Sequence, residues 1–400
     1  MRSTLFLALA LASATAFAQT PAPRGQELLV EAGRKLVVAP FDQAAGADNP
    51  TAPISPAEKL RRERLAVKNN APALALVRQA LQSKDDLAAA PPPTGVGDLM
   101  GFNFNAKMRA IARQFSQEAD VRMADGDFVG AANSKLDCME LGVALGRGSL
   151  VGAFVGQAIE SIGARDFEPI GARLDAQTCH AVADRMDSIE ARRSPLAQVL
   201  RDEGAFSART SLKTLADIQA QPKPLEGDEG SFPTRADIAA LKALTPAAFE
   251  ADQTRFFDAL VQNAQKPYSQ TPLTVPANLN PLTQLNLIWA KNGRYRFSFA
   301  RTQARARLLR NALVLRAIRL DTKVYPDFFE TPPDPFSPDG KPLVYEREGD
   351  SYELYSVGPD GKDDGGAEIQ TVEENPDSHV KVVTDKLTSN SRGDIVQTPI

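Results

Sequence analysis

Closely spaced aspartates near the C-terminus are the residues whose type and spacing most clearly suggest chemistry. Asp360, Asp363 and Asp364 stand within the run GPDGKDDGG, in which glycines alternate with the acids. Calcium prefers about six to eight oxygen ligands, including carboxylates and carbonyls, and glycine lets a chain curl around the ion. Carboxylates this close together also repel one another unless a cation lies among them. The pattern predicts a Ca²⁺ site, although the spacing is not that of an EF-hand and Asp-Gly clusters are also typical of solvated turns.

Side chains for catalysis are few. The chain has two histidines, His180 and His379, which cannot build a zinc site of several histidines. No G-x-S-x-G, H-E-x-x-H or Walker motif occurs in the sequence. The many Asp and Glu residues still permit a carbohydrate-active hydrolase with paired carboxylates, although Trp289 is the one tryptophan that could form a sugar platform. We expect a non-catalytic protein and keep a hydrolase as an alternative.

The N-terminus has the residue order of a secretory signal peptide. Arg2 precedes the apolar run LFLALALASATAF, and Ala16-Phe17-Ala18 supplies small residues for cleavage. The run is shorter than the ~20 residues that cross a bilayer as a helix. We expect residues 1–18 to be removed and the mature protein to be exported to the periplasm or the medium. Residues 19–54 are rich in Pro and Ala and are expected to form a linker that packs little.

Cys138 and Cys179 are the only cysteines. In an oxidising compartment such a pair can form one disulfide, provided that the two Cα atoms come within ~7 Å of each other. The alternative is two small apolar side chains buried on neighbouring helices. Both interpretations remain open from the sequence.

Charged residues are unevenly distributed in the last third of the chain. The whole sequence has a net charge of -4 and 43% hydrophobic residues, which is ordinary for a globular protein. Residues 291–320 carry basic side chains and no acid, whereas acids outnumber bases between 321 and 364. A basic amphipathic helix can lie on an anionic membrane or a polyanion. We expect instead that the acidic segment folds back on the basic helix, and we keep membrane contact as the alternative. Neither extreme of net charge is present, so we expect a protein partner and no nucleic acid.

Helical patterns fill residues 55–325. Ser55-Pro56 has the residues of an N-cap and a first helical position, and the helix that follows is expected to break at Asn69-Asn70. Four glycines at 142, 146, 152 and 156 favour a close helix crossing. Further helices are expected at 102–145 as a hairpin, and at 149–162, 175–192, 194–215, 246–265 and 282–320, with loops near 90–100, 219–233 and 266–282.

The C-terminal residues 326–400 read as a separate small module. The runs KPLVYERE and SYELYSVG alternate apolar and polar residues and are joined by Gly349-Asp350, a pair that favours a tight hairpin turn. Two strands alone are marginally stable, so the hairpin is expected to pack on the preceding helix through Leu343, Tyr345, Leu354 and Val357. The segment from 365 to 394 is expected to be a loose loop. The predicted fold is mainly α: an irregular helical-hairpin array with a small C-terminal antiparallel β-hairpin module.

This module resembles the C-terminal half of the major pseudopilin of type II secretion systems. The shared order is a long helix ending at Tyr325-Pro326, then the hairpin, LYSVGPDGKDDGG, and Gly393-Asp394-Ile395. The resemblance covers about the last 90 residues. It implies calcium binding by Asp360, by Asp363 or Asp364, and by Asp394, with Ser356 as a further ligand. The prepilin cleavage pattern and the exposed apolar assembly helix of that family are absent from the sequence.

The chain as a whole is similar to uncharacterised secreted bacterial proteins that join a helical body to such a tail. We therefore expect an exported, non-catalytic protein that binds another protein through its helical body, with a structural Ca²⁺ in the C-terminal loop. An accessory component of a secretion or pilus-like assembly is the first alternative, and the hydrolase is the second.

Overall fold

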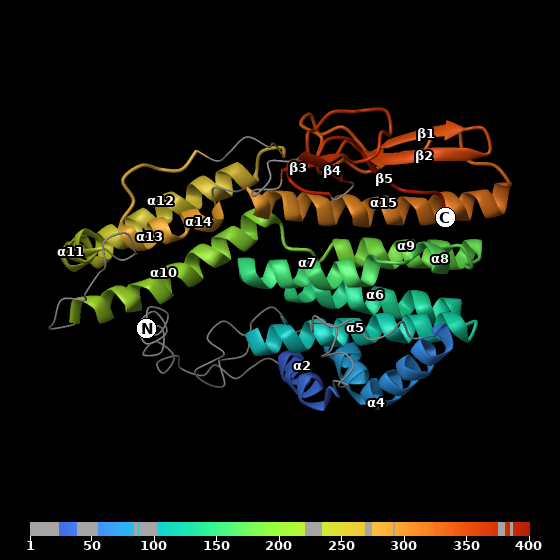
Figure 1. Cartoon of the computed structure of the whole chain (residues 1–400), viewed down its shortest axis with the longest axis horizontal. Helices are drawn as coiled ribbons and strands as arrows, with labels where there is room; N and C mark the ends of the chain where they lie inside the picture. The colour runs from blue at the N-terminus through green and yellow to red at the C-terminus, as the bar shows by residue number, and fades with distance from the viewer. Residues whose placement is uncertain are drawn as a thin grey trace.

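Stacked helices make up most of the molecule, and a small sheet lies on the last of them (Figure 1). This computed structural model describes residues 24–37, 55–83, 87, 102–220, 234–268, 274–290, 293–374, 381–384 and 387–400. The expected signal peptide and His379 lie outside these ranges. The mainly α fold with a small C-terminal antiparallel sheet is confirmed. The helices are α2 (Arg24–Lys35), α4 (Pro56–Gln82), α5 (Phe102–Ala124), α6 (Phe128–Leu145), α7 (Leu150–Ala164), α8 (Glu168–Gly171), α9 (Ala176–Glu190), α10 (Leu196–Ala220), α11 (Arg235–Ala243), α12 (Pro246–Ala264), α13 (Pro281–Leu285), α14 (Leu287–Ala290) and α15 (Arg294–Thr322).

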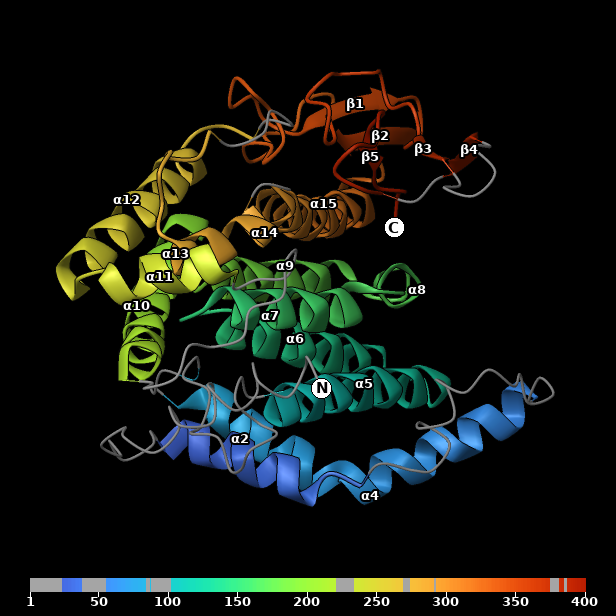
Figure 2. The ribbon, with the colours of Figure 1, turned by 60° about the vertical axis from the view of Figure 1, so that its left-hand side comes forward.

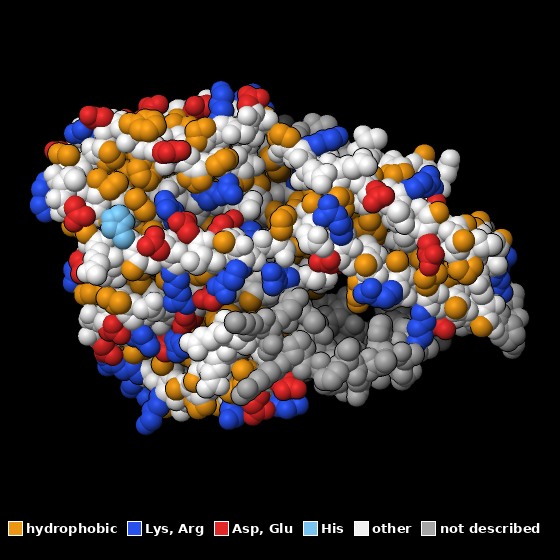
Figure 3. Space-filling model, turned by 180° about the vertical axis from the view of Figure 1, so that it is seen from behind, with side chains coloured by type: hydrophobic (Ala, Val, Ile, Leu, Met, Phe, Trp, Pro, Cys, Tyr) orange, Lys and Arg blue, Asp and Glu red, His pale blue; other side chains and the backbone are white. Residues whose placement is uncertain are grey.

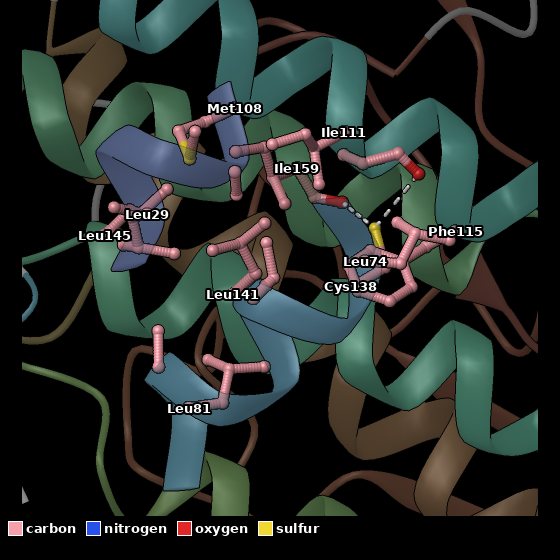
Figure 4. Close-up of a cluster of buried hydrophobic side chains, with 14 of the residues drawn as sticks. Leu29, Leu74, Leu81, Met108, Ile111, Phe115, Cys138, Leu141, Leu145 and Ile159 are labelled. Carbon is pink, nitrogen blue, oxygen red and sulfur yellow. Dashed lines mark hydrogen bonds between the residues drawn. The ribbon is translucent and has the colours of Figure 1, made fainter. Parts of the chain in front are cut away.

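Part of the expected N-terminal linker is a packed helix. α2 lies against α4, and its Leu29 and Ala32 are completely buried in the core drawn in Figure 4. The apolar side chains of α2 recur at helical spacing, so one face of this short segment can be buried against a partner helix. The prediction that residues 19–54 pack little is therefore wrong for α2.

α4 runs unbroken past the expected break at Asn69-Asn70. The fully buried Asn70 side chain accepts a hydrogen bond from Val37 N–H (2.8 Å) and donates to Gln114 Oε1 (3.1 Å). These bonds join α4 to the end of α2 and to α5, and they hold a residue of low helix propensity inside the helix. The prediction of a helix pair is wrong at this point. α4 curves in Figure 2, and Pro72 lies within it.

α6 and α7 cross closely at small residues. In the turn before α6, Gly126 has a φ of 79°, and Asp127 caps the helix by accepting a hydrogen bond from Gly130 N–H (2.8 Å). A Cβ on Gly156 would lie 2.3 Å from the carbonyl oxygen of Gly142. Only glycine allows the two backbones to approach this closely, so the expected crossing is confirmed.

α10 to α14 form an arm beside the stacked helices (Figure 1). Phe256 and Leu260 of α12 share a core with Val199 of α10. The single helix expected at 282–320 is instead divided into α13, α14 and α15. Gly293, with a φ of 60°, precedes α15 in the left-handed conformation, which a helix interior does not allow.

α15 lies between the helical body and the C-terminal sheet (Figures 1 and 2). Leu309 and Leu313 share a core with Met186 of α9. On the other side of α15, Ala304 and Leu308 share a core with the hairpin. Both faces of the basic helix are thus covered along much of its length.

The C-terminal module contains the predicted hairpin and one further strand on it. β1 (Val344–Glu348) pairs antiparallel with β2 (Ser351–Ser356), and Gly349 in their turn has a φ of 58°. β5 (Ile395–Val396) pairs with the other edge of β2 and places Ile395 opposite Ser356. The core beneath the hairpin contains the predicted residues Leu343, Leu354 and Val357, and the partly buried Tyr345 packs against it.

The segment from 365 to 394 is more ordered than expected where the structure describes it. β3 (Thr371–Glu374) pairs antiparallel with β4 (Lys381–Thr384), and Gln370 exchanges backbone hydrogen bonds with Arg392. The prediction of a loose loop is wrong for these residues. The pairing returns the chain to β2 and so determines where Asp394 lies.

Candidate functional site

Asp394, one of the carboxylates proposed as calcium ligands, lies beside the loop that carries Asp363 and Asp364, where β5 joins β2. Asp394 directly precedes β5, and its N–H donates to the Ala367 carbonyl (2.7 Å). This contact brings the end of the chain back to the loop that carries Asp363 and Asp364. Residues far apart in the sequence are therefore brought together.

Asp394 is the most deeply buried of these acids, with 1% of its surface exposed. Its carboxylate accepts hydrogen bonds from Gly366 N–H (2.8 Å) and Asp364 N–H (3.5 Å). Burial raises the pKa of Asp394 to about 6, and the neighbouring carboxylates of Asp364 and Asp363 act in the same direction. Its charge is disfavoured in this setting unless a cation approaches.

Asp363 and Asp360 complete the acidic group. Asp363 Oδ1 accepts hydrogen bonds from the Tyr355 hydroxyl (2.9 Å) and from Gly365 N–H (3.1 Å). Burial raises the pKa of Asp360, and the Asp364 carboxylate contributes to the rise. The charges of Asp364 and Asp363 thus act on Asp394, and that of Asp364 acts on Asp360. Each of Asp360, Asp363 and Asp394 also accepts a hydrogen bond from a backbone N–H.

Ser356 faces a different acid. Its hydroxyl donates to Asp334 Oδ1 (2.8 Å), and Asp334 also accepts from Phe336 N–H and Val357 N–H. Asp334 is buried, which raises its pKa, and these hydrogen bonds oppose the rise. Sequence reasoning did not assign a role to Asp334, which holds the loop before β1 against the end of β2. The signal was present in Asp334-Pro335-Phe336, because Asp often accepts a bond from the N–H two residues on.

The donor chemistry of the loop suits Ca²⁺, since carboxylate oxygens predominate. Across the described part of the chain, however, no three Asp, Glu, His or Cys side chains stand in an arrangement that could coordinate one ion. Calcium binding therefore stays a prediction, to be tested by experiment.

The two cysteines are free and buried in different cores. The Cys138 thiol lies against the carbonyl oxygens of Ala112 (3.6 Å) and Ile159 (3.4 Å) among apolar side chains (Figure 4). Cys179 lies instead in the core beside α15. Of the two alternatives left open by the sequence, the structure shows buried free thiols, because each cysteine fills an apolar position in a separate core. His180, the neighbour of Cys179, is exposed on α9.

Three arginines of α15, namely Arg296, Arg307 and Arg316, donate to backbone carbonyl oxygens. Arg316 donates to the carbonyls of Ala172 (2.5 Å), Leu174 (3.2 Å) and Ile400 (3.3 Å). The pair of Arg319 with Asp350 (3.9 Å) joins α15 to an acid of the module, and Asp350 is highly exposed. Among the described residues, the expected neutralisation by the acidic segment is therefore limited to this one ion pair.

Two adjoining hollows lie beside α15, with volumes of about 520 Å³ and about 340 Å³. Met139, Glu160 and Ala306 line both of them, so they meet at these residues. The larger hollow extends toward α9 and the loop at 330–333. The smaller hollow extends toward the end of α7 and β5.

A buried ion pair lies where the hollows meet. Arg193 donates from Nη1 to Glu160 Oε1 (3.0 Å) and from Nη2 to Glu160 Oε2 (2.5 Å), and its Nε donates to Glu190 Oε2 (2.7 Å). Burial raises the pKa of Glu160, which the Arg193 charge opposes. Two carboxylates thus share one hollow, as a hydrolase requires, but both are bound to the same guanidinium. This arrangement favours a structural role for the pair.

Charged side chains of both signs are interspersed over the face shown in Figure 3. None of the helices within the described ranges combines the length and the apolar character needed to cross a bilayer. Comparison of the chain with protein-family models, curated proteins and solved structures finds no match.

Proposed function

We propose that the chain is an exported, non-catalytic protein that binds another envelope or secreted protein through its helical body, with a Ca²⁺ ion stabilising its C-terminal module. The observation that carries this proposal is that the buried carboxylate of Asp394 lies against the loop that carries Asp363 and Asp364, whose charges act on it. In the described residues these carboxylates do not form a coordinating group, so an ion would have to draw them together. A cation there would neutralise acids that otherwise repel one another, and it would fasten the end of the chain to the sheet. Asp360 lies close enough to Asp364 for their charges to interact and completes the proposed ligand set.

A surface for the protein partner is supported where α7 meets α10. Val151 and Phe154 lie three residues apart on α7, and each exposes 38% of its surface. Phe206 of α10 is 45% exposed and lies one turn beyond Glu203, whose carboxylate accepts a hydrogen bond from Leu150 N–H (2.8 Å). Exposed apolar side chains on two helices that contact each other are typical of protein interfaces.

Site-specific photocrosslinking in the producing cells tests the partner surface. A photoreactive residue replaces Phe154 or Phe206, and the same residue at Phe328, which is 82% exposed in the module, is the matched control. We expect a discrete crosslinked protein of another chain from positions 154 and 206 and none from 328. A crosslinked product twice the mass of the chain would identify a second copy as the occupant and contradict a separate partner, as would identical products from all three positions.

A second candidate is an accessory component of a secretion or pilus-like assembly, which the pseudopilin-like tail favours. The position of Asp394 beside the Asp363–Asp364 loop supports this candidate. Co-purification of the tagged protein with secretion machinery supports this candidate, and crosslinking to a soluble secreted protein supports the first.

A further inference from the structure

The smaller hollow beside α15 contains two arginines that have no acidic partner among the described residues. Arg301 and Arg305 lie one turn apart on α15, and both line this hollow of about 340 Å³. The Arg301 guanidinium lies 5.4 Å from the centre of the Phe297 ring, and no ion pair is formed by either arginine in the part of the chain that the structure describes. The two positive charges therefore face the same space without neutralisation.

Partial burial lowers the pKa of Arg301, and the charge of Arg305 lowers it further. Other arginines of the molecule have acidic partners: Arg193 and Arg310, for example, each bind a carboxylate. A pair of like charges in a recess is unfavourable, unless an anion occupies the recess with them.

The acids that line the same hollow do not neutralise Arg301 and Arg305. Glu160 is bound to Arg193, and Glu168 accepts a hydrogen bond from Gln397 (3.5 Å). Asp166 lies in the turn between α7 and α8 and is exposed. Neither Asp166 nor Glu168 forms an ion pair with Arg301 or Arg305 in the described structure.

We propose that the hollow between α15, the end of α7 and β5 binds a small organic oxyanion, whose carboxylate or phosphate oxygens accept hydrogen bonds from Arg301 and Arg305. Guanidinium groups present paired donors that match the oxygens of either group. The volume of about 340 Å³ is within the range of small-molecule sites and too small for a folded partner. Arg305 is exposed, so the ligand can enter from solvent on that side. The site does not depend on the calcium or on the protein partner proposed above.

Calorimetric titration of the whole mature protein with citrate and, separately, with inorganic phosphate tests the site. The variants are Arg301→Gln and Arg305→Gln, and Arg294→Gln, an exposed arginine at the start of the same helix, is the charge-matched control. Losing charge-assisted hydrogen bonds should weaken binding about tenfold or more in each hollow variant and leave the control within about twofold of the unchanged protein. The stronger of the two probes distinguishes a carboxylate ligand from a phosphate ligand.

Thermal unfolding without added anion separates this site from a structural role for the arginines. Because the two charges repel each other, Arg305→Gln should leave the melting temperature unchanged or raise it slightly. Equal weakening in all three variants would show general attraction of anions to a basic helix and would overturn the proposal. Absence of saturable binding of either probe at millimolar concentration would overturn it as well.

Discussion

Replacing Arg193 by Met is expected to destabilise the protein strongly, and more at high pH than at low pH. The Arg193 and Glu160 side chains are 9% and 5% exposed, and two hydrogen bonds join their charged groups. Removing one partner of a buried pair typically costs about 3–5 kcal/mol of unfolding free energy, because the other charge stays buried without compensation. Glu190, which also binds Arg193, would lose its contact too.

The pH dependence follows from the carboxylate that is left behind. Burial already raises the pKa of Glu160, and loss of the Arg193 charge must raise it further. A raised carboxyl pKa contributes stability at low pH that is lost as the pH rises through the folded-state value. Arg193→Met should therefore be closer to the unchanged protein at pH 5 than at pH 8.

Urea unfolding at both pH values measures these differences, with Glu160→Gln and the double variant completing a cycle. The double variant should recover most of the loss, to within about 1–2 kcal/mol of the unchanged protein at pH 8, because no uncompensated charge remains. A loss below about 1 kcal/mol in Arg193→Met at pH 8, or a double variant as unstable as the sum of the single ones, would refute the reasoning.

Three further outcomes are expected. Gly156→Ala should lower the unfolding free energy by about 1–3 kcal/mol, because its Cβ would lie 2.3 Å from the Gly142 carbonyl oxygen. Val151→Ala, on the exposed face of α7, should change the unfolding free energy by less than about 0.5 kcal/mol. Urea unfolding that gives equal losses for the two variants would contradict the close crossing of α6 and α7. With a chelator present, the contribution of Asp394 to the unfolding free energy should be full below its ordinary pKa of 3.8 and should be lost as the pH rises through about 6. Asp394→Asn should remove this fall from a plot of unfolding free energy against pH. Thiol reagents should label neither cysteine in the folded protein and both cysteines after unfolding in urea without reductant. Cysteines that react in urea only after a reductant is added would show instead that they form a disulfide.

Local signals in the sequence predicted the ends of many helices and the hairpin. Ser149, Asp175 and Thr245 each cap the expected helix by accepting a hydrogen bond from the N–H three residues on. The Gly349 turn follows from the same kind of local preference. These features depend on neighbouring residues, so a single sequence is enough to predict them.

Features that depend on distant residues were missed or misread. Asn70 reads as a break, but its hydrogen bonds to Val37 and Gln114 come from other helices. Arg193 and Glu160 are 33 residues apart and meet only when the segment that follows α9 lies beside α7. The candidate calcium site depends on both kinds of signal. Asp360, Asp363 and Asp364 form a local cluster that the sequence shows, whereas Asp394 lies near them only because β5 pairs with β2.

Thermal unfolding at pH 7 with millimolar calcium and with chelator tests the central claim most directly, namely that the C-terminal aspartates hold Ca²⁺. Calcium at about 100 times its Kd should add about 2.7 kcal/mol to the unfolding free energy and raise the melting temperature. Asp394→Asn should abolish that increase, and Asp350→Asn, which removes a highly exposed acid from the hairpin turn, should preserve it. Equal melting temperatures of the unchanged protein in calcium and in chelator would contradict the claim.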